Sequence, residues 1–365
     1  MSGPVILYVH DLRGSGVVTN AIALARRMGA ERETILCAGY DEGLNRGVDV
    51  SPATLVTLST GPQPPKAKLL IAPALAKFIR SSGASTIVSM GNLGHRAAWI
   101  AAKAADVKTV FRISNEVGRA NAGWWKNFRR NRWHHRLRRS WTKGVLVGRA
   151  LAARPLFAQA IAKGDAAYIA NGVDIDGARA KAAAPPPHTW FEDGGPPIVL
   201  AIGRLHPQKN LQGLIEAASI ARRSTPFRLV IIGSGSAKLT AKLAALADAS
   251  GMADDILFAG EQSNVFAWLS RAALFALPSH WEGSSTALLE AMAVGTPILA
   301  SRQAGDASHV LDDGKFGRLV DANDPADIAA GIVDQLRDPV RPGERVEHFR
   351  LENTHRQYLE VLRDL

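Results

Sequence analysis

Two kinds of apolar pattern alternate along the chain. Short runs rich in β-branched and aliphatic residues predict buried strands, and longer stretches with apolar residues at helical spacing predict helices. In the first half, strands are predicted at 5–9, 33–38, 55–58, 86–90 and 108–113, and helices at 17–28, 67–81 and 93–105. Such regular alternation is typical of a doubly wound parallel sheet, which places the chain in the α/β class.

The alternation lapses between residues 172 and 197 and then resumes. This stretch is dense in turn formers, with three prolines at 185–187 and Gly-Gly-Pro-Pro at 194–197. Beyond it, strands are predicted at 198–202, 228–232, 256–258, 274–277 and 297–300, and helices at 211–223, 238–250, 265–272 and 287–294. We therefore predict two α/β domains, at 1–172 and 198–344, joined by a linker at 173–197. The amphipathic segment 345–365 is predicted to be a helix that either completes the second domain or folds back across the first.

Length and composition exclude several classes of protein. The chain has 365 residues, of which 47% are hydrophobic and 21% charged, as expected for a folded globular protein of two domains. No apolar run reaches the roughly 18–20 residues of a membrane-spanning helix. The start of the chain lacks the basic residues and the long apolar stretch of a signal peptide. A single cysteine, Cys37, excludes an internal disulfide and Cys-rich zinc modules. We therefore predict a cytoplasmic protein.

Positive charge is concentrated in one segment of the predicted first domain. Of a net charge of +11, residues 118–143 contribute nine Lys or Arg with no acidic residue, and they also hold four of the eight tryptophans. Tryptophan beside arginine is typical of proteins bound to an anionic membrane surface. Nucleic-acid binding uses similar residues, but nothing else in the chain resembles a nucleic-acid module. The predicted membrane or acceptor contacts are Trp124, Trp125, Arg129, Arg130, Arg132, Trp133, Arg136, Arg138 and Arg139.

Two loops that follow predicted strands carry glycine and cations. Asp11-Leu12-Arg13-Gly14-Ser15-Gly16 leads into a predicted helix, whose N-terminus favours an anion, although the third glycine of a dinucleotide fingerprint is absent. This loop fits a ligand or a simple tight turn. In the second half, Gly203-Arg204-Leu205-His206-Pro207-Gln208-Lys209-Asn210 has the same position. Arg204 and Lys209 are suited to neutralising a diphosphate, or they are solvated surface cations.

A third loop places two carboxylates eight positions apart. Glu282 lies in the predicted strand-to-helix turn and Glu290 lies two turns into the helix. Ser285 and Thr286 occupy the first helical turn, where free backbone N–H groups can hold a phosphate. Glu290 stands among apolar residues, so its carboxylate needs partners such as ligand hydroxyls. The alternative is an ordinary glutamate on a helix surface.

These motifs resemble family 4 of the retaining glycosyltransferases. The resemblance rests on GRLHPQKN at 203–210, PSHWEGSSTALLEAMAVGTPI at 278–298 with its E-x7-E spacing, GKFGRLV at 314–320 and NGVD at 171–174. It covers most of the chain and is strongest between 168 and 325. It implies the GT-B fold, in which two Rossmann-like domains face each other across a cleft, and a C-terminal helix that crosses back to the first domain.

The resemblance also implies roles for individual residues. Arg204 and Lys209 match the family's diphosphate-binding pair, Glu282 the carboxylate that contacts the donor sugar, and Glu290 the carboxylate that holds the ribose. Gly16 matches the glycine loop that closes on the phosphates. Asn115 stands where many members have a histidine near the donor sugar. An amide forms hydrogen bonds but takes no proton at neutral pH, so the leaving phosphate is expected to deprotonate the acceptor. His95 is a second candidate for the histidine, or a core residue.

No metal and no cofactor are expected. Asp174-Ile175-Asp176 matches the D-x-D motif with which a different glycosyltransferase fold chelates a divalent metal. Because the motif overlaps the NGVD turn, we expect it to cap a helix or to shape the hinge.

The sequence therefore predicts a metal-independent, retaining hexosyl- or N-acetylhexosaminyltransferase. Its donor is a nucleotide-diphosphate sugar, and both uridine and guanosine fit. The expected acceptor is membrane-associated: a lipid-linked saccharide, a glycolipid or a lipopolysaccharide core. The protein would then lie peripherally on the inner face of the cytoplasmic membrane. Two alternatives are a transferase that acts on a soluble anionic acceptor and a catalytically inactive protein that binds membranes.

Overall fold

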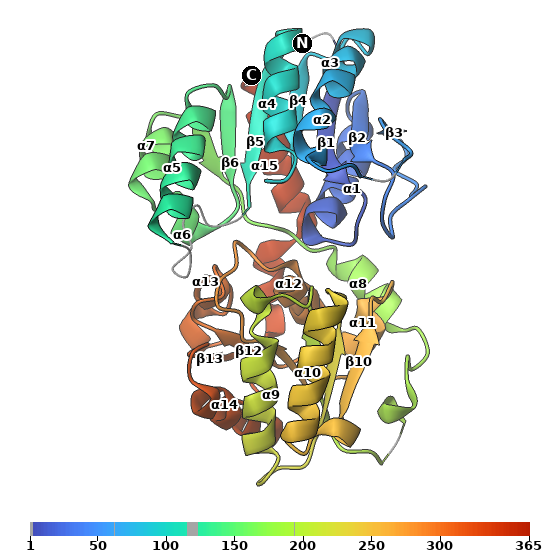
Figure 1. Cartoon of the computed structure of the whole chain (residues 1–365), viewed down its shortest axis with the longest axis vertical. Coiled ribbons are helices and arrows are strands. Elements are labelled where there is room, and N and C mark those ends of the chain that lie inside the picture. Colours follow the sequence, from blue (N-terminus) through green and yellow to red (C-terminus); the bar gives the residue numbers. More distant parts are fainter. Residues whose placement is uncertain (1–2, 62, 115–122, 193) are drawn as a thin grey trace. The chain divides into compact units, whose positions relative to one another are not determined.

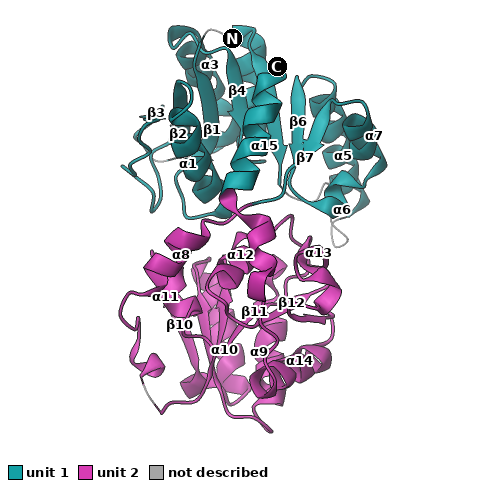
Figure 2. Cartoon of the chain, turned by 180° about the vertical axis from the view of Figure 1, so that it is seen from behind, with its two compact units in different colours: residues 1–171, 352–365 teal, residues 172–351 magenta. Residues whose placement is uncertain are grey.

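The computed structural model describes residues 3–61, 63–114, 123–192 and 194–365. The chain divides into two compact units (Figure 2). Unit 1 comprises residues 1–171 and 352–365, and unit 2 comprises residues 172–351. Each unit contains one parallel sheet with helices on its faces (Figure 1).

Unit 1 is built on a seven-stranded parallel sheet in the order β3-β2-β1-β4-β5-β6-β7. Its strands are β1 (Val5–Asp11), β2 (Thr34–Tyr40), β3 (Thr54–Thr57), β4 (Thr86–Ser89), β5 (Lys108–Ile113), β6 (Lys143–Leu146) and β7 (Ala166–Tyr168). The order reverses between β1 and β4, as in a Rossmann fold. At such a reversal the loops after neighbouring strands diverge and leave a crevice for ligands at the carboxyl ends of the strands.

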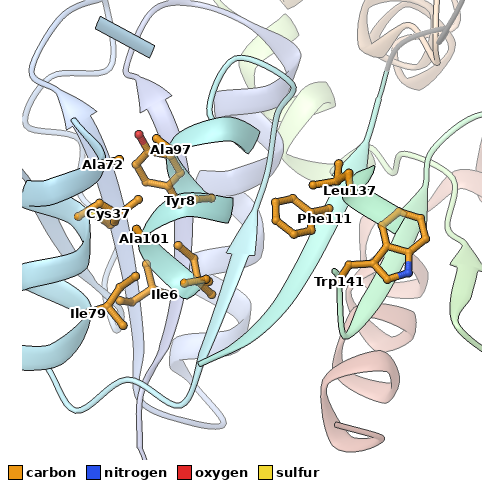
Figure 3. Packing of buried hydrophobic residues seen from close by; sticks show 14 of the residues in the cluster. Ile6, Tyr8, Cys37, Ala72, Ile79, Ala97, Ala101, Phe111, Leu137 and Trp141 are labelled. Carbon is orange, nitrogen blue, oxygen red and sulfur yellow. The ribbon is translucent and has the colours of Figure 1, made fainter. Parts of the chain in front are cut away.

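Helices cover both faces of this sheet. On one face lie α2 (Ala67–Leu70), α3 (Ala72–Ser81), α4 (His95–Ala105), α5 (Trp124–Arg138), α6 (Arg149–Ala152) and α7 (Pro155–Ala162). Figure 3 shows Tyr8 and Cys37 of the sheet beside alanines of α3 and α4, and Phe111 near Leu137 of α5. The small alanine side chains let these two helices pack close to the sheet.

The opposite face of the sheet carries α1 (Gly16–Gly29) and α15 (Leu351–Arg363). From α15, Tyr358, Leu359 and Leu362 are buried in the same core cluster as Val5 and Leu7 of β1. The prediction that the C-terminal helix crosses back to the first domain is therefore confirmed.

Unit 2 is built on a six-stranded parallel sheet in the order β10-β9-β8-β11-β12-β13. The strands are β8 (Ile198–Ile202), β9 (Arg228–Ile232), β10 (Ile256–Gly260), β11 (Leu274–Leu277), β12 (Ile298–Ser301) and β13 (Arg318–Val320). This order is the Rossmann order again, and it reverses between β8 and β11. The loops after these two strands therefore border the crevice in which a ligand is expected.

The helices of unit 2 form two groups. One face of the sheet packs against α9 (Leu211–Ala221), α10 (Ala237–Ala249) and α14 (Pro325–Arg337). A second group consists of α8 (Ile175–Ala182), α11 (Val265–Leu269), α12 (Thr286–Ala293) and the 3-10 helix η5 (Gly343–Phe349), which pack against one another. The remaining short elements are η1 (Thr189–Phe191), η2 (Pro207–Lys209), η3 (Ala253–Asp255), α13 (Ala307–Val310) and η4 (Asp312–Gly314).

Some local predictions differ from the structure. The predicted linker at 173–197 contains α8 and η1, and both belong to unit 2. The single helix predicted at 67–81 is two helices that meet at Ile71, and Pro73 lies in the first turn of α3. Proline supplies no N–H for a continuous helix, which explains the break. Strands β6, β7 and β13 were not predicted, because runs of three or four residues give little periodicity, although other strands of four residues, such as β11, were predicted.

None of the described helices has both the length and the apolar composition needed to cross a membrane.

Candidate functional site

The candidate site lies at the carboxyl edge of the sheet of unit 2. It is formed by the loop that follows β8, with Gly203, Arg204 and Lys209, and by the loop between β11 and α12, with Glu282. These loops follow the two strands between which the strand order reverses. The two motifs singled out in the sequence, 73 residues apart at Lys209 and Glu282, therefore meet at the expected ligand crevice.

Gly203 makes room for the side chain of Lys209. Its φ of 150° lies in a region that other residues rarely adopt, and a Cβ there would stand 2.6 Å from Cε of Lys209. After the neighbouring strand β9, Gly233 has a φ of 135°, and a Cβ on it would stand 2.0 Å from the carbonyl oxygen of Gly203. Both loops therefore need glycine, because backbone and the lysine side chain pass directly over these positions.

The 3-10 turn η2 directs Gln208 and Lys209 toward Glu282. Nδ1 of His206 accepts a hydrogen bond from the backbone N–H of Gln208 at 3.1 Å, which fixes the start of the turn. Asn210 ends it in the left-handed region with a φ of 52°. The same asparagine caps α9 through Gly213 and donates to the carbonyl of Ala322 at 2.7 Å, so the turn is fixed at both ends.

The carboxylate of Glu282 is held by three side chains. Lys209 Nζ lies 2.7 Å and Ser279 Oγ 2.9 Å from Oε1, and Gln208 Nε2 lies 3.2 Å from Oε2. Only 8% of Glu282 is exposed. An ionised group removed from water in this way needs a charged partner and further hydrogen bonds, and both are present. The carboxylate is therefore fixed in position before any ligand binds.

Gln208 and Ser279 are functional candidates that the sequence motifs did not reveal. Nε2 of Gln208 also donates to the backbone carbonyl of Trp281 at 2.8 Å. The backbone carbonyl of Gln208 accepts from the backbone N–H of His280 at 2.9 Å. Gln208 thus joins the two loops in both directions. The only indication in the sequence is position, since Gln208 precedes Lys209 and Ser279 follows the buried strand β11 closely.

Glu290 lies on α12, behind the loop that carries Glu282. It is partly exposed at the protein surface, yet burial raises its pKa to about 7, while the charges of Lys181 and Lys209 act in the opposite direction. A carboxyl group whose pKa is displaced in this way at a sheet edge is a typical feature of a functional site. Glu290 therefore changes its charge near neutral pH.

The N-terminus of α12 is open toward this region. Ser285 occupies the capping position and is 8% exposed, but its side chain makes no capping hydrogen bond to the helix. Thr286 is the first helical residue. The backbone N–H groups of the first turn of a helix have no partner within it, so they suit an anionic ligand. Arg204 is exposed at the start of the neighbouring loop.

In unit 1 the predicted glycine loop lies at the reversal point of the sheet. Gly16 is the first residue of α1, and Ser15 caps that helix through Val18. The adjoining Asp11 is buried and forms an ion pair with Arg13 at 2.8 Å. The loop is therefore rigidly attached to the end of β1, and Gly16 stands where the backbone N–H groups of α1 begin.

The sequence offers two candidates for a residue near the donor sugar, Asn115 and His95. Asn115 lies outside the described residues. His95 is 1% exposed, its Nδ1 lies 2.7 Å from Ser89 Oγ, and its ring packs edge-on against Phe111. Burial lowers the pKa of His95 to about 3, so it is a neutral residue of the core.

Residues 124–138 of the basic segment form α5. The predicted contact residues of this segment fall into two groups. Trp124 and Trp125 are 68% and 66% exposed and cluster with Phe128 in the first turns of the helix. Trp133 is instead partly buried, with its ring 5.9 Å from that of Trp99 on α4. Among the predicted arginines, exposed positions are Arg129, Arg132, Arg136 and Arg139, and partly buried ones are Arg130 and Arg138.

Trp133 and Arg136 contribute to the attachment of α5 to α4. The guanidinium of Arg96 lies 5.2 Å from the ring centre of Trp133, and that of Arg136 lies 5.2 Å from the ring centre of Trp99. Cation–π contacts of this kind stabilise a helix pair. Among the described residues of α5, the exposed large apolar side chains are those of Trp124, Trp125 and Phe128.

Comparison with known proteins shows a likeness in unit 2. The family model for glycosyl transferases group 1 matches residues 188–354, which make up most of unit 2. This part of the chain is therefore similar to the glycosyl transferases group 1 family. The match contains the loops with Lys209 and Glu282, and it confirms the resemblance seen in the sequence.

Curated relatives match less than half of the chain. D-inositol 3-phosphate glycosyltransferase of Acidothermus cellulolyticus is 34% identical over 184 residues, which are 46% of this chain and 41% of the relative. A GDP-mannose-dependent alpha-(1-6)-phosphatidylinositol monomannoside mannosyltransferase of Mycolicibacterium smegmatis is 34% identical over 173 residues, 44% of each chain. The matches thus span less than half the length of these relatives.

Solved structures match the whole chain in fold. Alr3699/HepE of Anabaena, in complex with UDP and glucose, superposes over 100% of both chains with a TM-score of 0.83 at 16% sequence identity. This likeness confirms the GT-B fold of two Rossmann-like units.

The D-x-D sequence has a structural role in unit 2. Asp174 caps α8 by accepting a hydrogen bond from the backbone N–H of Gly177 at 2.9 Å, as the sequence predicted. Asp176 lies 3.2 Å from Arg350. Within the described ranges, no three His, Cys, Asp or Glu side chains gather into a group that could hold a metal ion.

Proposed function

We propose that the protein is a retaining glycosyltransferase that uses a nucleotide-diphosphate sugar. The observation that carries the proposal is the carboxylate of Glu282, fixed beside Lys209 at the reversal point of the sheet of unit 2. Two observations support this assignment: the curated relatives are named as glycosyltransferases, and a protein of the same fold binds UDP. Transfer is of a hexosyl or an N-acetylhexosaminyl group.

The donor would occupy the edge of unit 2 from the loop after β8 to α12. Arg204, Lys209 and the first turn of α12, with Ser285 and Thr286, face the diphosphate and neutralise it. Glu282 accepts hydrogen bonds from hydroxyls of the donor sugar, and Glu290 accepts them from the ribose. Gly16, at the start of α1 in unit 1, leaves the backbone there open to the close approach of a phosphate.

The reaction needs no group beyond the two substrates. The bond between the anomeric carbon and the phosphate oxygen breaks as the acceptor oxygen bonds to the same face of that carbon. The acceptor proton passes to the leaving phosphate. Positive groups placed in advance around the diphosphate stabilise the charge that develops there, which is the largest contribution expected from the protein. Asn115 is expected to hold the sugar by hydrogen bonds, and no metal is required.

The acceptor is proposed to be membrane-associated: a lipid-linked saccharide, a glycolipid or a lipopolysaccharide core. The segment from residue 123 to 164 holds eleven Lys or Arg and no acidic residue, so its surface suits lipid phosphates. The exposed Trp124 and Trp125 suit the headgroup layer. The mannosyltransferase relative is named for a phosphatidylinositol glycolipid, which agrees with this choice. The protein would lie peripherally on the inner face of the cytoplasmic membrane.

A binding and turnover assay tests the proposal. The purified chain is titrated with UDP, GDP and their hexoses in the presence of EDTA, and is then incubated with the bound nucleotide sugar and membrane lipid extract. We expect one nucleotide series to bind, and release of the nucleoside diphosphate to depend on lipid. Glu282→Ala should abolish release and leave the circular dichroism spectrum unchanged.

Other results would point elsewhere. Transfer to a soluble anionic saccharide without lipid would favour the first alternative acceptor. Binding to anionic vesicles without any nucleotide binding would favour an inactive, membrane-binding protein and contradict the proposal.

A further inference from the structure

Two residues with separate roles toward the donor are bound to each other in this structure. Lys209 and Glu282 form an ion pair at 2.7 Å, and their side chains are only 17% and 10% exposed. In the proposed function, Lys209 serves the diphosphate and Glu282 serves the sugar. Neither can take up its full role while the pair is intact, because the ammonium group occupies Oε1 of the carboxylate.

The two partners differ in what remains when the pair opens. Without Lys209, Glu282 keeps Ser279 on Oε1 and Gln208 on Oε2, so its carboxylate stays in place. A carboxylate has about four acceptor positions, which leaves capacity for sugar hydroxyls. Among the described residues, the ammonium group of Lys209 has Glu282 as its side-chain partner and no comparable second anchor. Its stem lies over Gly203, where the missing Cβ leaves it room to move.

A diphosphate is the stronger partner for Lys209. It carries more charge than one carboxylate, and several of its oxygens can accept charge-assisted hydrogen bonds. The exposed Arg204 and the open N-terminus of α12 draw the same anion to this edge. When the lysine leaves, Gln208, Ser279 and the incoming sugar hydroxyls hold the carboxylate by hydrogen bonds, and these offset part of the cost of opening the pair.

We propose that Lys209 exchanges partners during the reaction, with Gln208 and Ser279 as the positioning residues that keep Glu282 in place. Lys209 neutralises Glu282 in the empty site and moves to the diphosphate when the donor binds, and Glu282 then accepts the sugar hydroxyls. After transfer the sugar is gone, and Glu282 competes with the product diphosphate for Lys209. The pair therefore lowers affinity for the bare nucleoside diphosphate and favours its release. This inference rests on the proposed function.

The exchange predicts that one substitution affects the binding of two ligands differently. In Glu282→Gln the competing charge is gone, so the affinity for the bare nucleoside diphosphate should rise by about fivefold or more. The intact nucleotide sugar should bind no more tightly, because its hydroxyls lose the carboxylate. Titration calorimetry on the full chain with UDP and UDP-hexose, or with the guanosine pair if that series binds, measures both. Glu216→Gln, on α9 and outside the site, is the control that removes the same charge.

The positioning residues give a second test. In Gln208→Ala and in Ser279→Ala the nucleotide sugar should bind more weakly, while affinity for the nucleoside diphosphate stays within about twofold of the wild type. Equal loss for both ligands would mean that these side chains only support the loop, and would overturn their assigned role. The thermal midpoint of each variant identifies a folding defect.

The outcomes separate this inference from the proposed function. Wild-type binding combined with unchanged or weaker binding of the nucleoside diphosphate to Glu282→Gln overturns the exchange alone. Failure of the wild type to bind any of the four ligands overturns both.

Discussion

At the scale of single residues, the two glutamates of the site have different surroundings. Lys209 lies at hydrogen-bonding distance from Glu282, whereas burial raises the pKa of Glu290 to about 7. Two carboxyl groups eight positions apart therefore have different tasks available to them near neutral pH. The pKa of Glu290 is about 4.3 in the unfolded chain and about 7 in the folded chain. Protonation of Glu290 therefore stabilises the folded state. This contribution is fully present below about pH 4.3 and is lost as the pH rises through about 7.

Nucleotide binding should depend on pH through Glu290. A ribose diol donates two hydrogen bonds, which favours the ionised carboxylate, so affinity for the nucleoside diphosphate should rise as the pH increases from 5 to 7, by up to about tenfold per unit. Calorimetric dissociation constants at pH 5, 6, 7 and 8 measure this. The nucleotide phosphates titrate in the same range, so Glu290→Gln is the necessary comparison. Equal pH profiles for the two proteins would exclude Glu290 from the ribose contact.

At the scale of elements, α5 shows that one helix can contain two kinds of tryptophan. Trp133 packs on α4 beside Arg96, and Trp141, in the turn that follows α5, stacks near Phe157. Trp124 and Trp125 have only Phe128 and each other as ring partners among the described residues. All four stand in one basic segment of the sequence, but only Trp124 and Trp125 are exposed.

Substitutions in α5 should separate membrane binding from stability. The double variant Trp124→Ala, Trp125→Ala should lose most of its binding to vesicles with anionic lipid, without a change in thermal midpoint. Trp133→Ala should keep vesicle binding and lose about 2 kcal/mol of stability, because a partly buried ring is removed from the helix pair. Vesicle sedimentation at low and high salt, together with thermal unfolding, gives both quantities. Unchanged sedimentation of the double variant would refute the assigned contact surface.

At the scale of the whole molecule, the chain completes unit 1 only with its last residues. Residues 352–365 follow unit 2 in the sequence but belong to unit 1. Within unit 1, α15 covers β1 on the face shared with α1. The final helix is therefore part of the core of unit 1 and not a tail.

Weakening α15 should destabilise unit 1 selectively. Leu362 is 1% exposed, and Leu362→Ala should cost about 2–5 kcal/mol by leaving a cavity against the sheet. Hydrogen exchange followed by mass spectrometry should show faster exchange in peptides of β1 and unchanged exchange in peptides of β8. Leu44→Ala, at a position 61% exposed, is the matched control with little expected effect. Equal acceleration in β8 would mean that the two units do not unfold separately.

The sequence by itself determined the features that are encoded locally. Strand–helix alternation predicted two parallel sheets, because period and turn formers act over a few residues, and the amphipathic pattern of 345–365 predicted a helix with one buried face. The motifs around Lys209 and Glu282 predicted a diphosphate and a sugar contact through their resemblance to a family. Some elements of three or four residues, such as β7, were missed because so few residues give only a weak pattern.

Only the tertiary structure decided which of these residues are partners. Gln208 and Ser279 gain their importance from meeting one carboxylate 74 and 3 positions away, and no local pattern records such a meeting. In the same way, Trp133 is a packing residue and Trp124 an exposed one because α4 lies against one end of α5 and not the other. A local pattern states which side of an element avoids water, but the element that covers that side is chosen by the fold of the whole unit.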